Sequence, residues 1–283
     1  MVISPVIVAN WTLLTGPLLI SHLLNWGLFG ALTVQVYVYY QAFPSDNVKC
    51  KSVVVFTYAL EVIQLMLATS DAFRLFARGW GDPMALDDVG LYWLSLVIMT
   101  TLISFVCQSF YAWRILALSG NSWMAMTVCL TSVMQTGCGV YDGAMVRAVG
   151  HASELSTSIV FRASIIWSAS SALCNLVITA SMVYYLLRAR KMTFRSTTSI
   201  LTRLLIFTLE TSILCAVVSV AALVCFIVSP ATSLYTVPLM ILSKLYSNSL
   251  LGVLNTRVKI IGGRDKFTTT SRFSSHEADS SLN

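Results

Sequence analysis

The sequence predicts an all-α protein, a bundle of seven transmembrane helices with the N-terminus outside and the C-terminus in the cytosol. Three observations predict this class: 57% of the 283 residues are hydrophobic, only 11% are charged, and several long stretches carry no charge. Soluble domains carry about 25% charged residues, and an ionised side chain in hydrocarbon costs roughly 2.5–3.5 kcal/mol. The composition therefore indicates an integral membrane protein.

The charge-free stretches are each long enough for a membrane span, because a helix needs about 20 apolar residues to cross the hydrocarbon. Runs of this length are typical of helices, whereas barrel strands alternate over about ten residues. We expect helices over about 16–40, 52–76, 89–117, 123–147, 159–188, 200–228 and 234–256. Residues 1–15 then form a short outer N-terminus, 16–256 the membrane domain, and 257–283 a cytosolic tail.

Turn residues separate these elements in order. The first helix ends at residues 42–47, which include Pro44, and the second at the glycines and proline of 79–83. Residues 119–122 end the third helix, the polar stretch 151–158 joins the fourth to the fifth, and 229–233 ends the sixth. The tail after the seventh helix is rich in charge and hydroxyl groups, so we expect it to be disordered.

The distribution of lysine and arginine predicts the orientation. Seven spans place the first, third and fifth loops on the side of the C-terminus. That side carries Lys49, Lys51, Arg114, Arg188, Arg190, Lys191, Arg195, Arg203, Arg257, Lys259, Arg264, Lys266 and Arg272. The other side carries Arg74, Arg78, Arg147 and Arg162. Because cytosolic loops are enriched in basic residues, the first side is the cytosolic one.

The partners expected from this distribution are lipids. The net charge of +6 belongs to a cytosolic surface, where basic loops meet anionic lipid, so no nucleic-acid partner is needed. We expect the plasma membrane rather than an internal one. Asn10 is a glycosylation acceptor in Asn10-Trp11-Thr12 on the outer side, close to the bilayer. The sequence specifies neither a ligand nor a cytosolic partner.

Ionisable residues inside the spans form the candidate polar core, because they need partners away from lipid. At 1.5 Å per residue, Glu61 and Lys244 lie near the middle of the membrane, and Glu210 lies about one turn nearer the cytosol. Lys244 is expected to pair with Glu61 or with Glu210. Asn248 and Asn255 share a face with Lys244 and extend the polar core along the seventh helix.

Nearer the outer ends, Asp71, Arg74 and Asp142 are candidates for the mouth of an outward cavity. The alternative for these residues is that they extend to the membrane interface.

We find no pattern typical of an enzyme: there is no G-x-S-x-G, no H-E-x-x-H and no Walker loop. His22 is the only histidine within a predicted span, which excludes a site built from several intramembrane histidines. We therefore expect no catalytic residues, no metal and no cofactor.

Five short segments resemble the basidiomycete multi-pass membrane proteins of the domain-of-unknown-function 6534 family. They are residues 16–20 (GPLLI), 35–40 (QVYVYY), 110–115 (FYAWRI), 243–251 (SKLYSNSLL) and 254–257 (LNTR). The resemblance runs over about residues 13–258 and is most specific in the seventh helix. It implies a fungal seven-helix membrane protein and supplies no catalytic residues.

Three classes of function remain open. The outer N-terminus, basic fifth loop and hydroxyl-rich tail favour a receptor-like protein by analogy of topology. The intramembrane Glu61, Glu210 and Lys244 favour a transporter or channel. A structural or scaffolding membrane protein is the third class.

Overall fold

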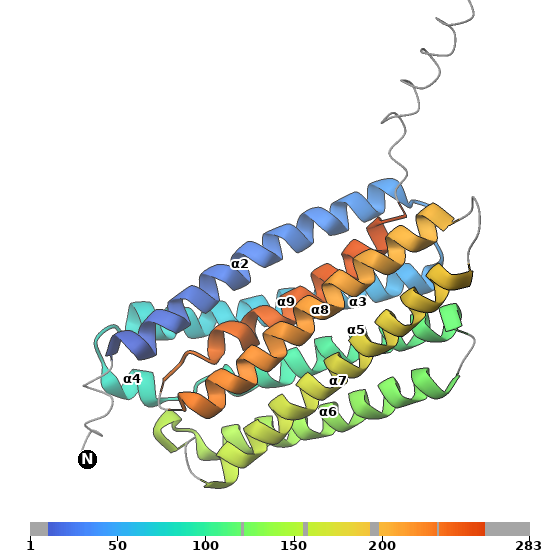
Figure 1. Ribbon diagram of the computed structural model, residues 1–283. Helices are drawn as coiled ribbons and strands as arrows, with labels where there is room; N and C mark the ends of the chain where they lie inside the picture. Colours follow the sequence, from blue (N-terminus) through green and yellow to red (C-terminus); the bar gives the residue numbers. More distant parts are fainter. Residues whose placement is uncertain (1–10, 120–121, 155–157, 193–197, 231, 258–283) are drawn as a thin grey trace, which may run out of the picture.

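The structure is a computed structural model that describes residues 11–119, 122–154, 158–192, 198–230 and 232–257. In these residues the long elements are α-helices and no sheet is formed. The helices are α2 (Trp11–Ala42), α3 (Val48–Phe73), α5 (Met99–Ser119), α6 (Ser122–Val149), α7 (Ser158–Met192), α8 (Thr198–Val228) and α9 (Thr236–Asn255). Figure 1 shows them side by side as an elongated bundle.

Short elements complete one end of the bundle. The π-helical turns η1 (Arg74–Arg78) and η2 (Trp93–Ile98) continue α3 and lead into α5, and the short helix α4 (Pro83–Asp87) lies between them. A 3-10 turn, η3 (Ala152–Glu154), follows α6. Asp82 caps α4 by accepting a hydrogen bond from the Met84 amide at 2.9 Å, as expected for an aspartate at a helix N-cap.

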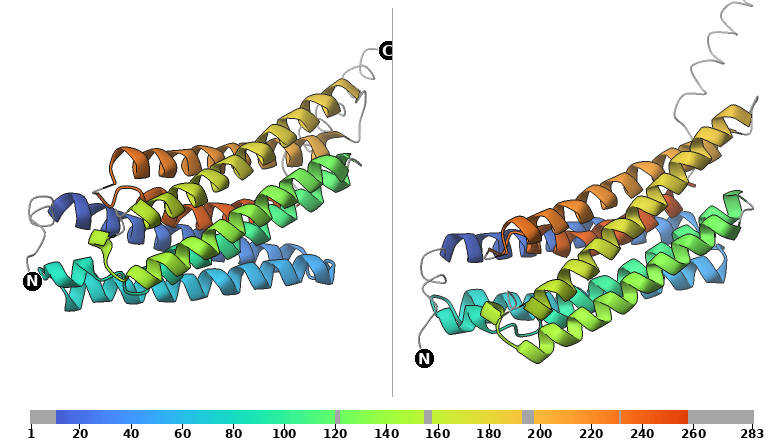
Figure 2. Two further views of the ribbon diagram at one scale, coloured as in Figure 1. Left: turned by 90° about the horizontal axis from the view of Figure 1, so that it is seen from below. Right: turned by 60° about the horizontal axis from the view of Figure 1, so that its bottom comes forward.

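Helix α9 lies at the centre of the bundle and packs against α2, α3, α5 and α8. Most of the remaining contacts join helices that are consecutive in the chain, since α5 packs on α6, α6 on α7 and α7 on α8, and α5 also contacts α7. The views in Figure 2 agree with this arrangement and show α9 between α2 and α8. Most of the side chains of α9 are buried, including serines, a lysine and a tyrosine.

Six stretches of the described chain are long and apolar enough to cross a membrane. They are Trp11–Ala42, Val48–Arg78, Trp93–Ala117, Ile159–Tyr185, Ile206–Val228 and Thr236–Asn255. Helix α6 is of similar length but does not meet the same criterion. The described chain is therefore helical, with six candidate membrane spans, and a seventh span would have to be α6.

Helix α6 reaches its neighbours through glycines. A β-carbon at Gly139 would lie 2.2 Å from Thr101 Oγ1 and 2.7 Å from the Trp167 indole nitrogen, and one at Gly143 would lie 2.6 Å from Ile98 Cδ1. These positions therefore allow α6 to approach α5 and α7 closely, as small residues do at helix interfaces in membranes.

Candidate functional site

An ion pair lies in the middle of the bundle. Lys244 of α9 donates to Glu61 of α3, and both side chains are fully buried. Glu61 also accepts a hydrogen bond from Ser247 at 2.5 Å, and the Lys244 ammonium lies 5.9 Å from the centre of the Phe29 ring. Of the two pairings that the sequence left open, the structure contains the one with Glu61.

Gln64 organises the polar groups around this pair. Its side-chain oxygen accepts from Lys244 and from Ser243, each at 2.9 Å, and its amide nitrogen donates to the Ser95 carbonyl at 3.0 Å and to Thr100 at 3.1 Å. It thereby links α3, α9, η2 and α5. Sequence reasoning missed Gln64, although it follows Glu61 by three residues and so lies on the same helix face.

Glu210 does not join this cluster, and its assignment to the polar core is corrected. Its side chain is exposed on α8, while Thr208, Ser212 and Cys215 are buried. At 100° per residue, position 210 points about 160–200° away from positions 208 and 212. The depth of Glu210 in the membrane was therefore compatible with pairing to Lys244, but the rotation of α8 about its axis directs Glu210 away from the bundle interior.

Asn248 and Asn255 connect α9 to α2. Their amide nitrogens donate to the carbonyl oxygens of Leu28 at 3.1 Å and Gln35 at 2.9 Å. Asn255 lies seven residues after Asn248, and its partner Gln35 lies seven residues after Leu28, so α2 and α9 run parallel. These contacts satisfy the two amide nitrogens inside the bundle and support a packing role for the polar face.

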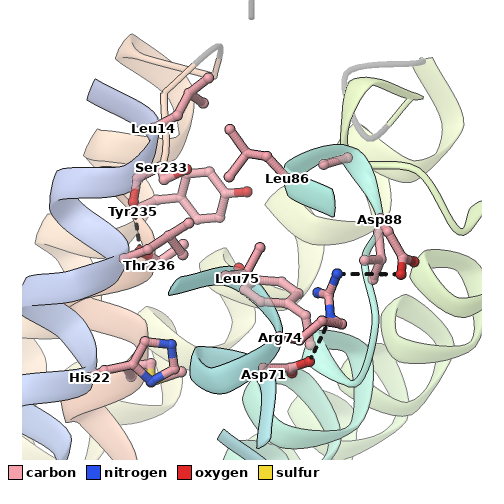
Figure 3. Close-up of a pocket in the computed structure, with 15 residues that line it drawn as sticks. Leu14, His22, Asp71, Arg74, Leu75, Leu86, Asp88, Ser233, Tyr235 and Thr236 are labelled. Atoms are coloured by element: carbon pink, nitrogen blue, oxygen red, sulfur yellow. Dashed lines mark hydrogen bonds and ion pairs between the residues drawn. The ribbon is translucent and has the colours of Figure 1, made fainter. Parts of the chain in front are cut away.

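The second feature is a cavity of about 100 Å³ near the end of the bundle that carries α4. It lies between α2, the α3–η1 junction, the segment 86–92 and the start of α9. Figure 3 shows the side chains that surround it, with His22 from α2, Asp71 and Arg74 from the α3–η1 junction, and Tyr235 and Thr236 at the start of α9. Leucines and Met240 contribute apolar surface.

The charged groups that line this cavity differ in how many hydrogen-bond partners they have. Arg74 donates to Asp88 at 3.3 Å and to the Ala85 carbonyl at 2.9 Å, and it makes a longer contact of 3.5 Å to Asp71 Oδ1. The Leu91 amide also donates to Asp71 Oδ1, at 3.0 Å. The other oxygen, Asp71 Oδ2, is buried and has no hydrogen-bond partner.

The local backbone places these charges. Gly90 has a φ of +52°, and a β-carbon there would lie 2.5 Å from the Arg74 guanidinium, so glycine gives Arg74 room to pass. The loop after α6 also binds the segment 86–92. The Val89 amide donates to the Gly150 carbonyl at 3.1 Å, and the Ser153 amide donates to Asp87. Turns of π-helix, which often accompany functional sites, flank the cavity.

The three residues predicted at an outer mouth are divided between two cavities. Asp71 and Arg74 line the larger one, whereas Asp142 lines a smaller cavity of about 20 Å³ and accepts a hydrogen bond from Ser164 at 2.7 Å. Tyr92 and Tyr235 border both cavities. The prediction of one shared mouth is therefore corrected, because α6 places Asp142 against α7 instead of α3.

A third cluster lies at the opposite end of the bundle. Asp46, in the turn between α2 and α3, accepts hydrogen bonds from Tyr39 at 2.8 Å and from Arg257 at 2.6 Å. The Arg257 guanidinium also lies 4.6 Å from the centre of the Phe43 ring. The hydrogen bond from Arg257 lowers the pKa of Asp46 below its ordinary value, although partial burial acts in the opposite direction. Sequence reasoning had assigned Asp46 only to a turn.

In the part of the chain that the structure describes, no group of three or more histidine, cysteine, aspartate or glutamate side chains is placed to hold a metal ion. Asn10, the predicted glycosylation acceptor, lies outside the described residues.

Comparison with known proteins gives a family match over part of the chain. Residues 171–259, which include most of α7, all of α8 and all of α9, match the model of a family of unknown function, DUF6534. Neither a curated protein nor a solved structure matches the chain. Over its last three long helices the chain is thus similar to DUF6534, a family whose function is unknown.

Proposed function

We propose that this chain is a receptor-like, non-enzymatic membrane protein that binds a small molecule in the cavity lined by His22, Asp71 and Arg74. The observation that carries the proposal is the cavity itself, which combines an apolar lining with a buried carboxylate oxygen that no group of the described chain satisfies. Ligand sites are typically concave and mostly apolar, with a few polar groups that fix orientation.

The proposed topology has seven spans, including α6, with the cavity outside and the Asp46–Arg257 cluster in the cytosol. The parallel run of α2 and α9 supports the same direction for the first and last spans, and hence an odd number of crossings between them. Helix α6 lies alongside α5 and α7, as a further crossing would. The excess of lysine and arginine on the Arg257 side supports the orientation.

Helix α9 supplies a physical connection between the two ends. Met240 lines the cavity, Lys244 one turn later holds the central ion pair, and Arg257 just beyond the helix binds Asp46. A shift of α9 on ligand binding would therefore act on contacts at the cytosolic end. Coupling of this kind requires two arrangements of one element with different affinity for the ligand.

The buried ion pair supports a structural role better than transport. Lys244 and Glu61 have no exposed surface, and each has further hydrogen bonds within the bundle. The proposal also places the protein in the plasma membrane, with anionic lipid at its basic cytosolic loops and a cytosolic partner that responds to α9. The short motifs of the sequence support a fungal, basidiomycete origin.

The orientation is tested by labelling Ser233→Cys, a cavity-lining position, with a membrane-impermeant maleimide. Intact cells should label this variant, whereas the native Cys50, at the opposite end, should react only after permeabilisation. The reverse pattern would contradict the topology and with it an outward-facing cavity.

The receptor role is tested in the same variant. Once the adduct occupies the cavity, the reactivity of Cys50 in permeabilised cells should change by at least about twofold. Glu154→Cys, an exposed position outside the cavity, is the matched control and should leave Cys50 unchanged. Equal Cys50 reactivity with and without the cavity adduct would argue against a receptor and favour a scaffold.

A further inference from the structure

We propose that the ligand of this cavity is a small amphipathic amine, bound as a cation with Asp71 as its counter-ion. This inference rests on the proposed function for the location of the ligand site, and it adds the chemical class of the ligand.

The first support is the unsatisfied carboxylate oxygen. Asp71 is only 6% exposed and lines the cavity. Its Oδ1 accepts from the Leu91 amide and contacts Arg74, while its Oδ2 has no partner. Buried polar atoms are nearly always hydrogen-bonded, because burial without a partner is costly. The missing partner must be a donor, and a protonated amine supplies donors together with a positive charge.

The second support is the balance of charge around the cavity. The charged groups that line it are Asp71, Asp88 and Arg74, which leave one unbalanced negative charge when His22 is neutral. The guanidinium of Arg74 is already engaged by Asp88 and by the Ala85 carbonyl. A monovalent cation would neutralise the site, whereas a carboxylate ligand would add a second unbalanced negative charge.

The third support is the apolar and aromatic surface beside the carboxylate. Leu14, Leu18, Leu75 and Leu86 line the cavity, and so do the rings of Tyr92 and Tyr235. Aromatic faces attract organic cations, and leucines bind the alkyl part. A bare metal ion would instead need several oxygen ligands, such as the six to eight around calcium. Amphipathic character in the ligand therefore fits the lining better than a metal ion.

The size of the cavity limits the ligand. A cavity of 150 Å³ accommodates benzene, so about 100 Å³ suits roughly four to five non-hydrogen atoms. n-Butylamine has this size, n-butanol is a matched neutral probe, and butyrate, which is one non-hydrogen atom larger, is the anionic probe.

The experiment measures protection of Ser233→Cys from the impermeant maleimide by each of the three probes. The readout is the probe concentration that halves the labelling rate at pH 7. We expect n-butylamine to protect at a concentration at least tenfold lower than n-butanol, and butyrate to protect least. Adding Asp71→Asn should bring the amine and the alcohol within about twofold of each other.

Glu210→Gln is the matched control for Asp71→Asn, because it removes the same charge from an exposed position on α8. It should retain the tenfold preference for the amine. If Asp71→Asn does not fold, the order of the three probes in the protein with native Asp71 still decides the inference.

Other outcomes separate this inference from the proposed function. Equal protection by amine and alcohol, best protection by butyrate, or no protection by any probe would overturn the amine ligand. In each case, labelling from outside and the response of Cys50 would continue to support a receptor. Failure of those two measurements would overturn the proposed function whatever the order of the probes.

Discussion

At the scale of single residues, the Lys244–Glu61 pair stabilises the bundle only while both charges are present. Breaking a buried pair on one side costs about 3–5 kcal/mol, because the remaining charge has lost its partner in a region without water. Replacing both members by neutral groups removes that penalty. The contribution of each residue is therefore not additive.

We accordingly expect Lys244→Met and Glu61→Gln each to lower the thermal stability of the detergent-purified protein, by about 3–5 kcal/mol. The double variant should recover part of the loss, and Glu210→Gln, on the exposed face of α8, should cost little. Thermal denaturation of the four variants measures the coupling. Losses that simply add in the double variant would contradict a coupled pair.

Gly139 provides a second test at this scale, because a β-carbon there would overlap the side chains of Thr101 and Trp167. Gly139→Ala should destabilise the protein by about 1–3 kcal/mol, the usual effect of overpacking. Gly137→Ala is the matched control on the same helix, since a β-carbon there meets nothing within 4 Å. Similar stabilities for the two variants, compared by thermal denaturation, would show that α6 can move away from its neighbours.

At the scale of elements, the Asp46–Arg257 contact joins the turn after α2 to the end of α9. The folded state holds the pKa of Asp46 below the unfolded value of about 3.9. A group whose pKa is lowered by folding stabilises the protein above its unfolded pKa. This stabilisation is lost as the pH falls through the folded pKa. The stabilisation by the contact therefore begins to decrease below about pH 4 and decreases further as the pH approaches the folded pKa.

The expected result is a stability difference between the native protein and Asp46→Asn that is smaller at pH 3 than at pH 7. Thermal denaturation at the two pH values measures it. Arg257→Gln added to Asp46→Asn should cause no further pH-dependent loss, because the partner carboxylate is already absent. A difference that stays constant from pH 7 to pH 3 would exclude Asp46 as the titrating group.

The long helices were predictable because each is a long apolar stretch with few charged residues. The helix expected over 16–40 is observed as Trp11–Ala42, and that expected over 52–76 as Val48–Phe73 with η1. The helix expected over 89–117 begins later, as η2 at Trp93, because Gly90 takes a positive φ and the chain turns there. The position of this turn depends on the φ angle of Gly90, and the number of apolar residues in a stretch does not predict that angle.

The site was predictable only where depth in the membrane determines contact. Glu61 and Lys244 share a depth and are paired, whereas Glu210 has a compatible depth but the wrong rotation. The cavity around Asp71 depends on how α2, η1 and α9 approach one another in space. No spacing in one segment of the sequence contains that information.

At the scale of the whole molecule, the polar groups are arranged in layers along the bundle. The cavity with Asp71 lies at one end, the Lys244–Glu61 pair in the middle, and Asp46 with Arg257 at the other end. Helix α9, together with Arg257 just beyond its end, contributes to every layer. Since it packs against four other long helices, it is the element through which most of the described bundle is held together.

The central position of α9 has a consequence for biosynthesis. Lys244 follows Glu61 by 183 residues, which at about 5–20 residues per second is a delay of roughly 10–40 s on the ribosome. During that interval α3 has been made and its carboxyl group has no lysine to meet. Until α9 is released, the carboxyl group of Glu61 must be hydrated or shielded by the translocon. A ribosome that stalls before α9 would therefore leave a membrane protein whose unpaired acid marks it as unfinished.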